Sequence, residues 1–203
     1  GDTAGPHRAA APRYADLRVL GQVFAGFIAL ESEDGLVLID QHAAHERVTF
    51  EKLRAELRGG AIRVQTMLTP ATLELNPARV AQVTAAMPEL HAMGFELELF
   101  GPASILIKGA PAVFGTEGGA KLLADMIDAM GEPGLRTGKE SLEDHLKTLA
   151  CHGSVRAGRT LRLPEIAELL AELDRTEFKT NCPHGRPVHI EFRRGTIERM
   201  FRR

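Results

Sequence analysis

Residues 36–47, with the sequence LVLIDQHAAHER, constrain the fold of this chain more than any other stretch. Four apolar residues of strand character are followed by Asp40 and then by a charged segment that ends at Gly59-Gly60. An aspartate directly after a strand is a good helix N-cap, and a pair of glycines is a common helix end. The stretch therefore predicts a buried strand that turns directly into a helix over residues 40–57.

This helix carries polar side chains on the face that should be buried. At about 100° per residue, Glu46 lies about 40° from His42, and the apolar Phe50, Leu53 and Leu57 lie within about 80° of it. A buried imidazole and a buried carboxylate are costly unless they are paired, and Zn²⁺ or Mn²⁺ would pair with both. His42 and Glu46 are therefore candidate metal ligands.

Two further carboxylates of this region each have two interpretations. Asp40 is either the helix N-cap or a carboxylate that binds metal and activates water, and these roles partly exclude each other. Glu51 falls about 180° from His42, among Arg47 and Arg54, so helical geometry favours a surface ion-pair partner over a site residue.

A second group of metal-ligand residue types lies far downstream, in a loop of sequence NCPHGRP. Cys182 and His184 offer a thiolate and an imidazole, and Arg186 suits a phosphate oxygen. Cys151 and His152 add another thiol and imidazole near the end of a predicted helix. The alternative is an ordinary Pro/Gly turn and two cysteines that are simply buried. Together with the helix, these residues form a zinc-type ligand set and suggest phosphodiester chemistry.

Strands and helices alternate imperfectly along the rest of the chain. Strands are expected at residues 18–30, 36–39, 62–68, 72–75, 95–100, 104–108 and 188–192, and helices at residues 40–57, 77–93, 117–130, 141–154, 163–174 and 196–201. Pro88 predicts a kink in the second helix. This order predicts an α+β fold or a mixed α/β sheet. The apolar character of the first two strands predicts a sheet covered on both faces.

Composition narrows the classes of function. The 203 residues are 44% hydrophobic and 26% charged, which is typical of a soluble chain with one domain or two small subdomains. No apolar run is long enough to cross a bilayer, and two cysteines are too few for a disulfide framework, so we expect an intracellular protein. A net charge of −2 gives no global drive toward nucleic acid, and the five arginines of the last eleven residues fit a solvated helix.

These residues resemble the C-terminal domain of the MutL mismatch-repair proteins, in the branch that carries an endonuclease. The family motif Asp-Gln-His-Ala-x-x-Glu-x-x-x-x-Glu matches Asp40, Gln41, His42, Ala43, Glu46 and Glu51, Cys-Pro-His-Gly-Arg-Pro matches residues 182–187, and Phe-x-Arg matches Phe201 and Arg203. The resemblance covers roughly residues 18–203. The family's Ala-Cys-Arg motif appears here as Ala150-Cys151-His152, which makes His152 an additional candidate ligand or proton carrier.

The resemblance implies a homodimeric endonuclease that nicks one strand of duplex DNA near a mismatch. By that analogy Glu46, Cys182 and His184 bind regulatory Zn²⁺ with His42 and Cys151 nearby, and Mn²⁺ or Mg²⁺ serves cleavage. The catalytic candidates are Asp40, Glu46 and Arg186. ATP and a mismatch-recognition protein would act through the full-length chain, in the cytoplasm at the nucleoid. The rival function is a zinc-stabilised dimerisation and clamp-docking scaffold without its own catalysis.

Residues 65–70, of sequence QTMLTP, look like the peptide by which replication proteins bind the sliding clamp. Gln65 would anchor it, Met67 and Leu68 would fill apolar pockets, and Pro70 would keep it extended. The alternative is an edge strand that runs into a turn.

The resemblance also divides the chain into parts. Residues 1–14 would be a linker, residues 15–68 and 139–203 would form the dimerisation and endonuclease subdomain with the metal site, and residues 69–138 would be a smaller external regulatory subdomain.

Overall fold

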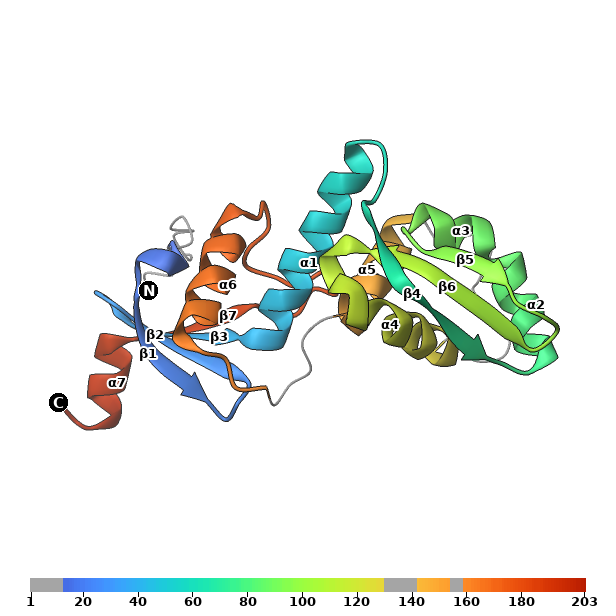
Figure 1. Cartoon of the computed structure of the whole chain (residues 1–203). Helices are drawn as coiled ribbons and strands as arrows, with labels where there is room; N and C mark the ends of the chain where they lie inside the picture. The colour runs from blue at the N-terminus through green and yellow to red at the C-terminus, as the bar shows by residue number, and fades with distance from the viewer. Residues whose placement is uncertain (1–12, 130–141, 154–158) are drawn as a thin grey trace, which may run out of the picture. The chain divides into compact units, whose positions relative to one another are not determined.

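The computed structural model describes residues 13–129, 142–153 and 159–203. Within these ranges the chain forms two antiparallel sheets and seven α-helices, so the predicted α+β class is confirmed (Figure 1). None of the helices in these ranges is long and apolar enough to span a bilayer. Residues 1–12 of the expected linker lie outside the described residues, as do positions 130, 141 and 154 at the ends of two expected helices.

The chain divides into two compact units, Gly1–Val48 with Val155–Arg203, and Thr49–Ser154. The division places residues 49–68 and 139–154 in the second unit, whereas the resemblance assigns them to the dimer-forming part. The physical reason is packing, because Phe50 and Leu53 of one helix and Leu149 of another belong to the core of the second unit.

The first unit is a four-stranded sheet, and α6 (Leu163–Arg175) and the start of α1 (Gln41–Arg58) pack on its core face. Its strands are β1 (Arg18–Val23), β2 (Phe27–Ser32), β3 (Gly35–Asp40) and β7 (His189–Arg193), in the order β1-β2-β3-β7, and its other elements are η1 (Tyr14–Asp16) and α7 (Arg194–Met200). Ile28 and Leu30 of β2 and Ile39 of β3 share a core with Leu169 and Leu173 of α6.

Residues 18–30 form two strands, where the sequence predicted one. Phe24 and Ala25 adopt positive φ angles of 53° and 49°, and the Gly26 N–H donates to the Val23 carbonyl at 3.2 Å. Tight hairpin turns usually place Asn or Gly at such positions, and Phe and Ala here do not predict a turn. A second hairpin joins β2 to β3, with Ser32 opposite Gly35.

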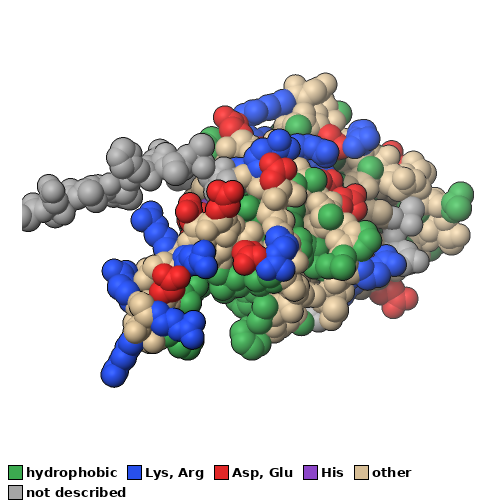
Figure 2. Space-filling model, turned by 90° about the vertical axis from the view of Figure 1, so that its left-hand side faces the viewer, with side chains coloured by type: hydrophobic (Ala, Val, Ile, Leu, Met, Phe, Trp, Pro, Cys, Tyr) green, Lys and Arg blue, Asp and Glu red, His purple; other side chains and the backbone are tan. Residues whose placement is uncertain are grey.

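The outward face of the first unit's sheet is apolar, and the residues that the structure describes leave much of it exposed. Because strand side chains alternate, Phe27, Leu36, Leu38, Ile190 and Phe192 lie opposite the core face. Three of them are exposed, and the two leucines are partly buried. The prediction of a sheet covered on both faces is thus wrong for the single chain. Hydrophobic side chains gather in one area of the surface, with Lys and Arg beside it (Figure 2).

The second unit has a three-stranded sheet in the order β4-β6-β5. Its elements are β4 (Val64–Glu74), α2 (Pro77–Ala85), α3 (Met87–Ala92), β5 (Glu96–Leu99), β6 (Ser104–Pro111), η2 (Ala112–Phe114), α4 (Gly115–Ala129) and α5 (Leu142–Gly153). The predicted break at Pro88 is confirmed, because α2 ends before Ala86 and Pro88 lies in the first turn of α3. The two short strands expected at residues 62–75 form the single strand β4, whose register with β6 shifts between Thr66 and Ala71.

Candidate metal centre

Asp40 lies at the junction of β3 and α1 and caps the helix. Its Oδ1 atom accepts hydrogen bonds from the backbone N–H groups of His42 at 2.9 Å and Ala43 at 3.0 Å. The Asp40 N–H donates to the carbonyl of Val188, next to β7, at 2.8 Å. The capping interpretation is confirmed. Because both capping hydrogen bonds end on Oδ1, capping of the helix does not use the Oδ2 atom.

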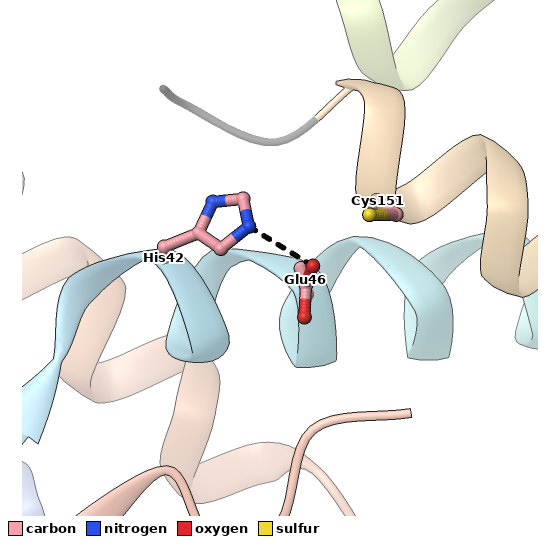
Figure 3. Close-up of side chains that lie close together, drawn as sticks. All are labelled: His42, Glu46 and Cys151. Atoms are coloured by element: carbon pink, nitrogen blue, oxygen red, sulfur yellow. Dashed lines mark ion pairs between the residues drawn. The ribbon is translucent and has the colours of Figure 1, made fainter. Parts of the chain in front are cut away.

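Glu46 is a carboxylate in the interior of the first unit, with 0% of its side chain exposed. The Nε2 atom of His42, one turn earlier on α1, lies 3.0 Å from its Oε1 atom (Figure 3). Burying an ionised carboxylate is costly unless positive charge or hydrogen-bond donors surround it. The helical phase predicted from the sequence for these two residues is confirmed.

The loop of residues 181–187 lies against the same turn of the helix. It closes on itself through an Asn181–Pro187 bridge and a Cys182 N–H bond to the Arg186 carbonyl at 2.8 Å, with Gly185 at a φ of 86°. The positive φ at this turn favours glycine. Arg47 of α1 ties the loop down, because its Nε donates to the Asn181 carbonyl at 2.6 Å.

Helix and loop together place three potential ligands around one point. Ligand atoms of Glu46, Cys182 and His184 all lie within 4.8 Å of one another. Cys182 is 1% exposed and His184 is exposed, with its Nδ1 atom 3.7 Å from Glu46 Oε2. The set therefore has a buried carboxylate, a buried thiol and an imidazole that reaches solvent.

Arg186 supplies positive charge to this group. Its Nη2 atom donates to both carboxylate oxygens of Glu46, at 3.2 Å each. A hydrogen bond to the Cys182 side chain and the charge of Glu46 raise the pKa of Arg186 above its usual value.

The donor set fits a divalent metal ion. One oxygen, one nitrogen and one sulfur donor are the combination that zinc takes in proteins, and a site with three protein ligands leaves a position for water. The fit is one of residue type and mutual distance, and it leaves the identity of the ion open.

A buried amide network fixes the start of α1 and was not foreseen. The Gln41 side chain is buried, and its Oε1 accepts from Gln22 Nε2 at 2.5 Å. Both side chains also donate to the carbonyl of Arg159. The role of Gln22 had no sequence signal, because its partners are distant along the chain. The burial of Arg47 was equally unforeseen, since helical phase places it on the face opposite His42.

Comparison with known proteins decides the family. The sequence model of the MutL C terminal dimerisation domain matches residues 20–161 of this chain. The chain belongs to this family. A MutL DNA mismatch repair protein of Phenylobacterium zucineum is 42% identical over 183 residues, which are 90% of this chain and 29% of that protein. One of Geotalea uraniireducens is 40% identical over 203 residues, 100% of this chain and 34% of that protein. The chain thus spans about a third of the MutL proteins it matches.

The remaining residues of the MutL motifs belong to other parts of the chain. Glu51 belongs to the second unit, where its side chain is 16% exposed and 3.7 Å from Arg54. Glu51 thus has the ion-pair partner expected from the sequence, but its side chain is mostly buried and does not lie on the surface. The other motif residues are Cys151 and His152 on α5 in the second unit, and Phe201 and Arg203 at the exposed end of the chain after α7.

The clamp-like segment of this MutL chain lies in the edge strand β4, at its register shift. Gln65, Leu68 and Pro70 are exposed, and Leu68 is fully so. Met67 is buried in the core of the second unit. An inward-facing methionine cannot fill a pocket of a partner without unfolding, so only the other three residues are presented for docking.

Proposed function

We propose that this chain is the dimer-forming part of a MutL protein and carries a metal-dependent endonuclease site that nicks duplex DNA. The observation that carries the proposal is the buried Glu46 carboxylate, enclosed by Cys182, His184 and Arg186. Structural needs alone do not favour a fully buried acid beside a thiol and an imidazole. MutL relatives are named for DNA mismatch repair, which is consistent with DNA as the substrate.

The residues divide the chemistry between them. Glu46, Cys182 and His184 hold the ion, and His42 orients the Glu46 carboxylate through its 3.0 Å contact. A bound Zn²⁺, Mn²⁺ or Mg²⁺ would activate a water and offset the charge that develops on the phosphate. Asp40 offers its non-capping oxygen to that water. Cys151 stays a further candidate ligand, as the sequence motif proposes.

Conversion of a supercoiled plasmid to its nicked form, in Mn²⁺ with a sliding clamp added, tests the proposal. Asp40→Asn is the sharpest variant, because asparagine is as good an N-cap as aspartate while the negative charge is lost. We expect nicking to fall by about 100-fold or more. Asp34→Asn, in the exposed turn before β3, is the matched control and should nick normally. Equal nicking by the Asp40 variant and the wild type refutes the catalytic role.

The alternative is a metal-stabilised scaffold that dimerises and docks the clamp without cutting. The net charge of −2 favours it, because such a chain has no general attraction for DNA. Zinc binding and dimerisation without nicking, under the conditions above, would establish the scaffold in place of the enzyme.

We further propose that the dimer forms through the outward face of the first unit's sheet. Exposed Phe27, Ile190 and Phe192 are the kind of contiguous apolar surface that marks a protein interface. A groove of 760 Å³ lined in part by Leu20, Leu36 and Ile197 adjoins it. A second copy is the natural occupant, since the family is named for dimerisation.

Clamp docking is proposed for the register-shifted segment of β4. Exposed backbone at an edge strand can pair with an extended groove, and Gln65 and Leu68 point outward from it. Gln65→Ala with Leu68→Ala should abolish clamp binding in a pull-down while the dimer persists. Thr72→Ala with Glu74→Ala, at exposed positions of the same strand, is the control. Unchanged clamp affinity in the first pair would refute the assignment.

A further inference from the structure

Two arginines, Arg47 of α1 and Arg186 of the loop at residues 181–187, lie beside the candidate metal ligands and make different contacts there. Arg47 is buried and donates to the backbone carbonyl of Asn181 at 2.6 Å. Arg186 is 59% exposed, and its side-chain bonds go to Glu46 and Cys182, both of which are candidate ligands. Arg47 therefore fixes the position of the loop, whereas Arg186 neutralises the groups that would bind an ion.

The contact between the Arg186 guanidinium and Glu46 can be broken without unfolding the loop. The Arg186 Nη2 atom lies 3.2 Å from each Glu46 oxygen, which is longer than the roughly 2.7–2.9 Å of strong charge-assisted hydrogen bonds. Because both bonds come from this one nitrogen, the pair lacks the bidentate geometry in which two nitrogens each contact one oxygen. The loop does not depend on this contact, because backbone bonds between Cys182 and Arg186 and between Gly185 and Cys182 close it. The side chain can leave while the loop stays folded.

A divalent ion and this guanidinium need the same two oxygens. An ion bound by Glu46, Cys182 and His184 would lie beside the Arg186 nitrogen, and like charges at such a separation repel strongly in a partly buried site. The displaced guanidinium would stay next to the metal site, because the backbone carbonyl of Arg186 remains bonded to the Cys182 N–H at 2.8 Å.

We propose that Arg186 and a divalent ion compete for the carboxylate of Glu46, so that capture of the ion releases Arg186 to a phosphate of DNA. This inference rests on the proposed metal centre and adds a coupling to it. Because binding free energies are linked, an ion that frees the arginine must strengthen phosphate binding, and phosphate must strengthen ion binding by the same factor.

Titration of the full chain with Co²⁺, followed through the absorbance of the cobalt–thiolate bond, measures the competition directly. Arg186→Gln should bind Co²⁺ about tenfold more tightly than wild type, which corresponds to about 1.4 kcal/mol. Arg186→Lys keeps the positive charge and should stay within about twofold of wild type. Arg194→Gln, which removes an exposed arginine paired with Glu198, should change nothing. Thermal unfolding of each variant checks that it is folded.

Fluorescence anisotropy of a short labelled duplex measures the release. Wild type should bind the duplex more tightly with Co²⁺ present, and Arg186→Gln should lose that gain. Unchanged or weaker Co²⁺ binding by Arg186→Gln overturns the competition. An equal gain in DNA affinity for both proteins, or no gain in wild type, overturns the release. Absence of Co²⁺ binding in wild type is a different result, because it removes the metal centre itself.

Discussion

The two sheets of this chain differ in what they leave uncovered. In the first unit the outward face of β3 and β7 carries Leu36, Leu38 and Ile190, with Leu38 directly opposite Ile190. In the second unit the corresponding face carries Glu98 and Lys108, which form an ion pair at 2.9 Å. A polar outward face needs no partner, whereas an apolar one does. We therefore expect the sheet of the first unit, rather than that of the second, to pair with a second copy of the chain.

The largest expected effect comes from charging the apolar face. Leu38→Arg should raise the dissociation constant of the dimer by about 100-fold or more, because an unpaired charge would be buried at the interface. Leu106→Arg is the matched control, since Leu106 is also a partly buried, outward-facing leucine on the central strand of its sheet. Sedimentation velocity over a concentration series measures both. Equal weakening by the two variants would remove the distinction between the sheets.

The carboxylates of α1 give the second comparison. Glu46→Gln should lower the unfolding free energy by about 1–3 kcal/mol, because the fully buried acid pairs with His42 and Arg186. Glu51→Gln, in the other unit, should cost less, because the Glu51 side chain is 16% exposed whereas the Glu46 side chain is fully buried. Urea unfolding of both variants gives the two values. A larger loss for Glu51 would contradict the assignment of the site to Glu46.

Much of the fold was predictable where the cause is local. The strand-to-helix junction at Asp40, the break at Pro88 and the shared phase of His42 and Glu46 follow from rules that span a few residues. The hairpin turn at Phe24 was missed, because its positive φ angles fall on residues that rarely adopt them.

The site could be predicted as residue types but not as contacts. Arg186 and Glu46 are 140 positions apart, and no periodicity reports their meeting. The burial of Arg47 and Met67 likewise comes from tertiary packing, which overrides the exposed positions expected from local pattern. The ligand residues could therefore be predicted from the sequence, whereas their arrangement depends on how the loop packs against the helix.

Removing a side-chain hydroxyl should also change stability differently in the two units, but by a smaller amount. The Tyr14 hydroxyl is 2.7 Å from His189 Nδ1 and joins η1 to β7, so Tyr14→Phe should cost about 1 kcal/mol. Thr84→Val removes a bond to the Val80 carbonyl within one helix and should cost close to nothing. Urea denaturation measures both, and a neutral Tyr14→Phe would show that the hydroxyl does not stabilise the first unit.

The smallest expected effect is a pH dependence of the first unit. Burial lowers the pKa of His189 below its ordinary value of 6.5, against the raising influence of Glu191. The unfolded chain then binds more protons just below pH 6.5, so stability should fall as the pH drops beneath that value and be flat above it. His189→Gln should reduce the slope in pH-dependent urea unfolding. A wild-type stability that increases on acidification would contradict the sign.

Anomalous X-ray scattering from crystals of the chain grown with zinc tests the metal centre. We expect a peak at the zinc edge between the Glu46 carboxylate, the Cys182 sulfur and His184, with Arg186 turned away from Glu46. A map without a peak at these residues, or with Arg186 still bonded to Glu46 beside a bound ion, would contradict it.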